Sequence, residues 1–416
     1  MNSDLLFHSR TRHWLRRFAH ARTFAIAAAM AFGTLAAAPA AMADDATSRD
    51  TGNGDSRRTE YIYVGDNGDP SDSTDDAIKR VNLADGTVSV FSRPDSPAAF
   101  LGINGLIFNH GELLAVNQNN SLPGGGNGSV FRLNGGSGAF TDYLIEPLNA
   151  PYAPQGIVFG GGNRDWRHPW QPDHYYIANI LKSGETCEKV DEGDVFEYGE
   201  WGGRPIRVLN HGNKPALFNA NFYPRGVVFG PDGMLYVSAR GCPAVPSTDP
   251  RTLLAYILRF DPQTHALDAV IVTNETVNAQ HLGYSLHRPE GLVFDDQGYL
   301  WVTSFIDGTA AANPNDRNNV DRIIKIDVRS RKVIDSIPLW KAGKDRASAQ
   351  ALIFGPGGKL YIPISGNTPD TAGELRRCDT RTKQCEAFVK VGKGLVAPWF
   401  AIFKNSDPAT LRYVPH

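Results

Sequence analysis

Apolar and polar positions alternate along the chain in a unit that recurs about every 60 residues. Each unit opens with a short, wholly apolar phrase that ends in phenylalanine. The copies of this phrase are residues 105–108, 156–159, 226–229, 291–294 and 351–354, with a variant at 400–403. Short phrases rich in valine, leucine and isoleucine are typical of strands that are buried on both faces.

Three further strand-like runs follow each phrase. A turn rich in glycine, such as 230–233, leads to a second apolar run such as 235–237. A variable loop then precedes a third run of alternating character (256–259) and a fourth, outermost run (333–337). Four strands per repeat at this period predict the blade of a β-propeller.

The number of repeats predicts a ring of six blades. Five copies are complete, whereas residues 61–64, 78–81 and 88–91 supply only the second to fourth strands of another copy. Its first strand is found at 400–403. We therefore expect an all-β, six-bladed β-propeller closed by a C-terminal first strand that joins the N-terminal blade, which leaves no open inner edge. A surplus run at 411–414 keeps seven blades as a minor alternative.

Residues 1–43 are predicted to be a secretory signal peptide. A region with five arginines precedes an alanine-rich apolar run and the sequence Ala-Met-Ala. A membrane anchor, the alternative, needs about 20 strongly apolar residues. We expect an exported protein, periplasmic or secreted, and the pair Arg16-Arg17 leaves both the Sec and the twin-arginine route open. Residues 44–58 are predicted to be disordered, and 59–416 to form a single propeller domain.

The net charge and the cysteine content limit which classes of partner and which cell compartment we expect. The formal net charge of −2 becomes more negative once the arginine-rich leader is removed, which argues against a nucleic-acid partner. No later stretch is apolar enough to span a membrane. Cys378 and Cys385 flank a polar turn and are predicted to form a disulfide, so Cys187 and Cys242 pair by elimination. A zinc site is the alternative, but no C-x-x-C motif or nearby histidine spacing supports it.

The residue before each innermost strand is expected to face the mouth of the central channel. These residues are Asn104, Gln155, Arg225, Glu290, Gln350 and Trp399. The long insertions of the repeat are predicted to open on the same face, and long loops on a rigid scaffold tend to carry function. Convergent polar groups at a concave mouth predict a site for a small ligand. A polar, water-filled channel without a ligand is the alternative.

Glu290 and Arg225 come from consecutive blades and are expected to touch. As a catalytic pair, Arg225 would hold a carboxylate, lactone or amide oxygen while Glu290 handles a proton. As a structural pair they would form an ion bridge across a blade seam. His281 and His287, on the link before Glu290, are further acid–base candidates, of which His287 is also expected at the ligand.

The loop at 66–76 contains five acidic residues. Calcium takes six to eight oxygen ligands, so Asp66, Asp69 and Asp72 are candidate ligands of a loop calcium ion. A solvated acidic loop is the alternative. No motif of a serine hydrolase, P-loop nucleotide site, haem protein or zincin occurs.

Two segments carry a resemblance to a known family. Residues 289–302, with Pro-Glu-Gly at their start, resemble a blade of the regucalcin/gluconolactonase family, and the Asn-Gly entry at 103–108 resembles another. Residues 230–237 are similar to NHL-repeat proteins and streptogramin lyases. The resemblance implies six blades and a divalent metal, calcium, magnesium or zinc, that activates a substrate carbonyl at the channel mouth.

The resemblance also implies roles for single residues. Glu290 and Asn104 match two of the family's metal ligands, whereas Trp399 stands where the family has an acid. The function expected is a lactonase-like hydrolase or lyase acting on a small ring ester or related molecule. Glu290 and Arg225 would then be catalytic, with Asn104, Gln155, Gln350, Trp399 and His287 binding the substrate. The alternative is a non-catalytic binding or scaffold propeller that recognises a sugar, peptide or protein partner on the same face.

Overall fold

The computed structural model describes the propeller region with gaps in its loops. The described residues are 60–68, 75–95, 99–118, 127–162, 172–180, 193–210, 218, 220–241, 254–306, 318–339, 346–366, 368, 370 and 372–415. The predicted signal peptide, the predicted disordered segment and the pair Cys187–Cys242 lie outside these residues.

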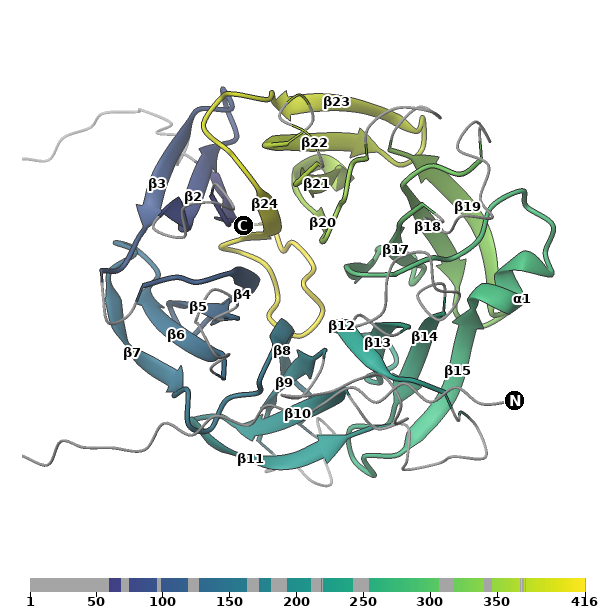
Figure 1. Ribbon diagram of the computed structural model, residues 1–416, viewed down its shortest axis with the longest axis horizontal. Helices are drawn as coiled ribbons and strands as arrows, with labels where there is room; N and C mark the ends of the chain where they lie inside the picture. The colour runs from purple at the N-terminus through teal and green to yellow at the C-terminus, as the bar shows by residue number, and fades with distance from the viewer. Residues whose placement is uncertain are drawn as a thin grey trace, which may run out of the picture. The chain divides into compact units, whose positions relative to one another are not determined.

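Six four-stranded antiparallel sheets form the blades, each ordered from an innermost to an outermost strand (Figure 1). Blade 1 is β24 (Pro398–Phe403), β1 (Tyr61–Asp66), β2 (Ala77–Asn82) and β3 (Val88–Ser92). Blade 2 is β4 (Ile103–Asn109), β5 (Glu112–Asn117), β6 (Ser129–Asn134) and β7 (Phe140–Ile145). Blade 3 is β8 (Pro154–Gly160), β9 (His174–Asn179), β10 (Asp194–Gly199) and β11 (Gly202–Leu209).

The remaining blades follow the same order. Blade 4 is β12 (Tyr223–Phe229), β13 (Leu235–Arg240), β14 (Ala255–Phe260) and β15 (Leu267–Thr273). Blade 5 is β16 (Leu292–Phe294), β17 (Leu300–Ser304), β18 (Arg322–Asp327) and β19 (Lys332–Pro338). Blade 6 is β20 (Ile353–Phe354), β21 (Leu360–Ile364), β22 (Glu374–Asp379) and β23 (Gln384–Val389). The short helix α1 (Asn274–Asn278) follows β15. No helix among these residues is long and apolar enough to cross a membrane.

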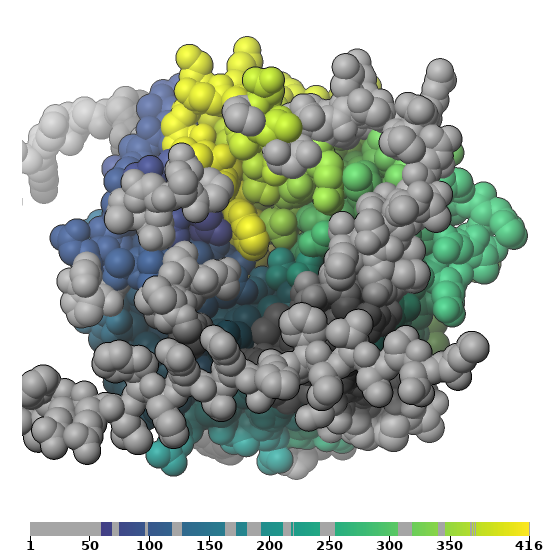
Figure 2. Space-filling model, viewed as in Figure 1, coloured from purple at the N-terminus to yellow at the C-terminus, as the bar shows by residue number. Residues whose placement is uncertain are grey.

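The ring closes as predicted, with the C-terminal strand β24 inside the N-terminal blade. β24 pairs antiparallel with β1, and both figures of the whole molecule show the first and last described segments side by side (Figures 1 and 2). Asp66, fully buried at the end of β1, accepts the backbone N–H groups of Val396 and Ala397 and lies 2.6 Å from the Lys79 ammonium. Its carboxylate thereby ties the entry of β24 to the N-terminal blade.

The residues after β24 do not begin a seventh blade. Instead, the N–H groups of Phe159 and Phe229, at the ends of two innermost strands, donate to the carbonyls of Pro408 and Ala409 at 2.9 Å and 3.0 Å. Leu411 is buried in the same segment. The C-terminal segment thus occupies the end of the channel opposite to the entries of the innermost strands, and the alternative of seven blades is wrong.

The phenylalanine that ends each repeat phrase packs at a seam between blades. In five of the six seams its ring packs edge to face against an aromatic residue on the second strand of the preceding blade, with ring centroids at most 6.2 Å apart. The pairs are Phe108–Tyr63, Phe229–Tyr176, Phe294–Tyr236, Phe354–Trp301 and Phe403–Tyr361. Aromatic pairs of this kind add about 0.5–1.5 kcal/mol beyond the burial of their area, so the repeated phenylalanine is a device for joining blades.

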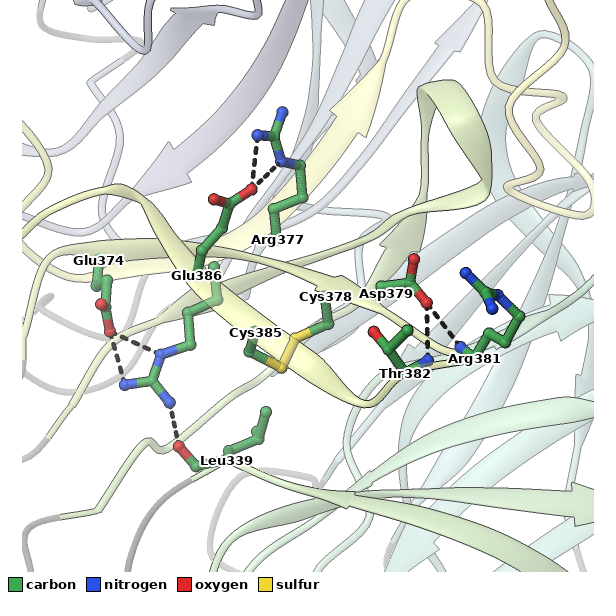
Figure 3. Close-up of a disulfide and its surroundings, with 10 residues drawn as sticks. Leu339, Glu374, Arg377, Cys378, Asp379, Arg381, Thr382, Cys385 and Glu386 are labelled. Atoms are coloured by element: carbon green, nitrogen blue, oxygen red, sulfur yellow. Dashed lines mark hydrogen bonds and ion pairs between the residues drawn. A yellow bond between two sulfur atoms is a disulfide. The ribbon is translucent and has the colours of Figure 1, made fainter.

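One predicted disulfide is confirmed. Cys378 on β22 and Cys385 on β23 are paired in register and bonded (Figure 3). Beside them, Arg377 donates to one oxygen of Glu386 through Nε at 2.8 Å and through Nη2 at 2.6 Å. The outermost hairpin of blade 6 is therefore held by a covalent bond and an exposed ion pair.

Candidate functional site at the channel mouth

Local irregularities in three innermost strands turn side chains towards the channel mouth. The pairing of β4 with β5 shifts register between Ile103 and Leu106, and the same shift occurs in β8 and β12. Asn104, Gln155 and Arg225 each lie within such a bulge. A bulge takes its residue out of the regular ladder and redirects the side chain, so the three residues occupy the same structural position in blades 2, 3 and 4.

A glycine follows the mouth residue in four blades because the neighbouring blade lies too close for a side chain. A Cβ atom on Gly226 would lie 2.4 Å from the carbonyl oxygen of Glu290, and one on Gly105 would lie 2.7 Å from that of Gln155. Each glycine thus packs against the mouth residue of the next blade. The repeated pair of a polar residue and glycine brings the innermost strands together around the axis.

Hydroxyl groups on second strands position Glu290. The Thr303 hydroxyl oxygen accepts the N–H groups of Glu290 and Gly291 at 3.2 Å and 3.1 Å. The Ser238 hydroxyl donates to the Glu290 carbonyl and accepts the Gly226 N–H at 2.8 Å. β16 begins at Leu292, one residue later than the start of the repeat phrase in the sequence.

The structure brings all six predicted mouth residues to one cavity. Asn104, Gln155, Arg225, Glu290, Gln350 and Trp399 line it, together with Phe400 and the intervening glycines. The cavity volume is about 30 Å³, which is room for about one water molecule. One functional group of a ligand fits there, and the body of the ligand would lie outside the cavity. Most of the long loops that the sequence predicted on this face fall outside the described residues.

Neutral amides form one side of the cavity. The Asn104 side-chain amide donates to the Gly102 carbonyl at 3.3 Å, and the Gln155 amide donates to the Ala153 carbonyl at 3.5 Å. Each side chain is thus anchored to the backbone two residues earlier. Each amide nitrogen keeps a second N–H, so Asn104 and Gln155 can offer a ligand an acceptor oxygen and one donor.

Charged groups form the other side. The Glu290 carboxylate contacts Arg225 Nε through Oε2 and lies 3.3 Å from Arg240 Nη1 through Oε1. Arg225 Nη2 also donates to Gln350 Oε1 at 3.3 Å. The Arg225 and Glu290 side chains are only 9% and 3% exposed. Arg225 and Glu290 therefore form a buried ion pair across the seam of blades 4 and 5, with a second arginine on the same carboxylate.

Arg240 is a site residue that the sequence reasoning missed. It ends β13 at the place that Asp66, Asn117, Asn179 and Ser304 occupy in other blades, where each of these accepts an N–H from the link into an innermost strand. Arg240 instead reaches Glu290 of the next blade. Burial, followed by the nearby charge of Arg225, lowers the pKa of Arg240 to about 9, against the opposing effect of Glu290. Alignment of the repeats is the signal that singles out this arginine.

The residues at the mouth do not fit the divalent metal that the resemblance implies. Both oxygens of Glu290 are in contact with guanidinium groups, which repel a cation at short range. Within the described part of the chain, no group of three or more His, Cys, Asp or Glu side chains is arranged to hold a metal ion. The donor set at the mouth is suited to an anion.

The other predicted site residues that the structure describes do not line the cavity. His287 does not line it; its N–H donates to the Ser304 hydroxyl at 3.0 Å, and its carbonyl accepts the Phe305 N–H at 2.8 Å. His281 is exposed beyond α1. Asp66, predicted as a calcium ligand, is used in ring closure as described above, and Asp69 and Asp72 lie outside the described residues.

Comparison with known proteins assigns no family to this chain. No family model matches the sequence, and no curated protein does. The chain is a six-bladed β-propeller. Solved structures similar to it include virginiamycin B lyase from Staphylococcus aureus, at 15% identity over 80% of this chain and 85% of that chain with a TM-score of 0.40. A luciferin-regenerating enzyme matches at 12% identity over 82% and 97%, with a TM-score of 0.43. Hydrazine synthase from Kuenenia stuttgartiensis matches at 13% over 78% and 80%, with a TM-score of 0.45.

Proposed function

We propose that this propeller binds a small molecule at the mouth of its channel, through a carboxylate or carbonyl oxygen that faces Arg225. The observation that carries the proposal is the convergence of six mouth residues on one cavity, with cationic groups on one side and amide groups on the other. An arginine presents several N–H donors in a planar fork that suits carboxylate oxygens. Hydroxyl groups on the same ligand would donate to Asn104 and Gln155.

Affinity for a monocarboxylate tests this proposal. Butyrate is titrated calorimetrically into the purified protein, into Arg225→Gln and into Glu290→Gln. Arg225→Gln should lose binding because it removes the donor. Glu290→Gln should bind about tenfold more tightly, because the carboxylate that competes for Arg225 and Arg240 is neutralised. Glu386→Gln is the matched control, since Glu386 makes an exposed ion pair with Arg377 on the outer strand.

Weaker binding of butyrate to Glu290→Gln would contradict the proposal, as would unchanged binding to Arg225→Gln. Melting temperatures of all variants, measured in parallel, show that each protein is folded. The two substitutions have opposite predicted signs, so a general loss of structure cannot imitate the expected pattern.

A lactonase-like hydrolase or lyase acting on a ring ester is the second candidate. It is favoured by one specific observation, because Glu290 and Asn104, the two residues that match family positions, meet at one cavity. In this reaction Arg225 would hold the ester carbonyl while Glu290 takes a proton from the attacking water. Both oxygens of Glu290 are already in contact with guanidinium groups, so neither is free to face an attacking water, which is why binding is placed first.

Turnover separates the two candidates. Hydrolysis of a panel of lactones is measured with and without calcium, magnesium or zinc, before and after treatment with a chelator. The enzyme hypothesis predicts turnover that Glu290→Gln abolishes, whereas the binding hypothesis predicts none with any lactone or metal.

Export of the protein is part of the proposal. The signal-like residues 1–43 and the disulfide Cys378–Cys385 both support an oxidising compartment outside the cytoplasm. Cell fractionation, with N-terminal sequencing of the recovered protein, tests it: we expect a mature chain that begins after Ala43.

A further inference from the structure

Two more arginines lie beside the mouth on the same face. Arg288 is in the link that enters β16, and Arg346 is in the link that enters β20. Their guanidinium carbons lie 5.4 Å and 5.0 Å from the centroid of the same Phe305 ring. Contacts of this length are cation–π interactions, so two guanidinium groups from different blades share one aromatic ring.

The backbone holds this arrangement in place. Arg288 has a φ of 42°, in the left-handed region that a non-glycine residue rarely adopts. Phe305 is buried, and its N–H donates to the His287 carbonyl at 2.8 Å, which ties the ring to the same link. A residue kept in an unfavourable conformation by its surroundings is a recurrent feature of functional sites.

Among the described residues, arginines outnumber carboxylates around this part of the mouth. Arg346 Nη2 lies 3.5 Å from Asp321, whose carboxylate also accepts the N–H groups of Ile306 and Ser348. Together with Arg225 and Arg240, four arginines are matched by two carboxylates, Glu290 and Asp321, among the described residues.

The arginines also act on one another. Burial is the largest cause of the lowered pKa of Arg288; Glu290 opposes this effect, and the charges of Arg346 and Arg225 add to it. Like charges that are brought together and partly removed from water repel. A second anionic group of a ligand would relieve this repulsion.

We propose that the ligand carries two anionic groups, one held by Arg225 at the cavity and the other by Arg288 and Arg346 over Phe305. This inference rests on the proposed function, because the first group is the one assigned there. It narrows the ligand to a small dicarboxylate or a phosphorylated carboxylic acid. Such a molecule bridges blades 4, 5 and 6 at the channel mouth.

The experiment compares dicarboxylates with a monocarboxylate on the whole purified protein. Succinate, glutarate and adipate are titrated calorimetrically at low ionic strength, with butyrate as the reference. The dicarboxylate of best-matching length should bind at least tenfold more tightly than butyrate. Arg288→Gln and Arg346→Gln should each reduce this advantage several-fold and weaken butyrate binding much less, and the double variant should abolish the advantage. Arg288→Lys, which keeps the charge, should retain most of it.

Arg329→Gln is the matched control, because Arg329 is exposed in the turn between β18 and β19 at the opposite end of blade 5. Equal affinities for butyrate and all three dicarboxylates, with both classes lost in Arg225→Gln, would overturn the second anionic group and leave the proposed function standing. A dicarboxylate advantage that survives in the double variant would also overturn it. Absence of binding by every probe would overturn the proposed function and this inference together.

Discussion

The two sides of the channel mouth share one backbone design and differ in chemistry. In blades 2 and 3 the bulged residues are Asn104 and Gln155, and each is anchored to its own link by an amide hydrogen bond. In blade 4 the bulged residue is Arg225, which contacts Glu290 of the next blade. The amide side is thus held within each blade, whereas the charged side is held between blades.

The second strands repeat this difference. Asn117 and Asn179 end β5 and β9 and accept the N–H groups of Leu101 and Ala153 at 2.7 Å and 2.9 Å. Arg240 ends β13 at the same position and reaches across the seam to Glu290. In blade 4, a buried charge therefore stands where blades 2 and 3 have a local structural contact. A buried charge is costly to maintain, and its presence at a cavity suggests a role other than stability.

The largest effect on stability is expected from removing one partner of the Arg225–Glu290 ion pair. Arg225→Met leaves the buried Glu290 with one arginine, and we expect it to reduce the free energy of unfolding by about 3–5 kcal/mol. The double variant Arg225→Met/Glu290→Leu removes both charges and should recover most of this loss. Urea unfolding measures both values. A double variant as unstable as the single one would contradict a buried ion pair at this seam.

A smaller effect is expected from the glycines, and it should be unequal between the sides. A Cβ at Gly226 would lie 2.4 Å from the Glu290 carbonyl oxygen, whereas one at Gly156 would lie 3.0 Å from that of Arg225. We expect Gly226→Ala to cost about 2–3 kcal/mol of stability and Gly156→Ala less, since overpacking of a closed core costs about 1–3 kcal/mol. Equal losses in thermal or urea unfolding would show that the two seams are packed alike.

The repeat phrase predicted the ring and all six mouth residues because a strand buried on both faces leaves an unmistakable apolar run, and its first residue is placed by topology. Arg240 was not predicted, since an arginine that ends a strand usually points into solvent, and only its register against Asn117 and Asn179 distinguishes it. The engagement of Glu290 by two arginines depends on side-chain contacts across a seam. Such contacts join residues about 50–65 positions apart in the chain and leave no local pattern.

The amide side contains a titratable carboxyl group, Asp76, whose contribution to the stability of the fold depends on pH. Asp76 accepts the Gly102 N–H at 2.7 Å, and burial raises the pKa of Asp76 to about 6. A carboxyl whose pKa is higher in the folded than in the unfolded state stabilises the fold when protonated, and this contribution is lost as the pH rises from about 4 through 6.

Asp76→Asn keeps an acceptor for Gly102 and removes the charge. It should therefore stabilise the protein by about 1–2 kcal/mol at pH 8 and have no effect at pH 4. Melting temperatures across this range measure the difference. A stabilisation that is equal at both pH values would show that Asp76 titrates normally.

The smallest effect is expected away from the mouth altogether. Glu386→Gln breaks the exposed pair with Arg377 beside the disulfide (Figure 3). Exposed pairs contribute about 0–1 kcal/mol, so unfolding in urea should change by less than that. A loss as large as that of Arg225→Met would remove the contrast between buried and exposed pairs on which the comparison depends.

A crystal structure grown with butyrate and with calcium tests the central claim most directly, because it shows which species occupies the mouth. The account predicts carboxylate density at the Arg225 guanidinium, within the cavity that Asn104, Gln155 and Gln350 line, and no metal at Glu290. A calcium ion coordinated by Glu290 and Asn104, with Arg225 turned away, would contradict it.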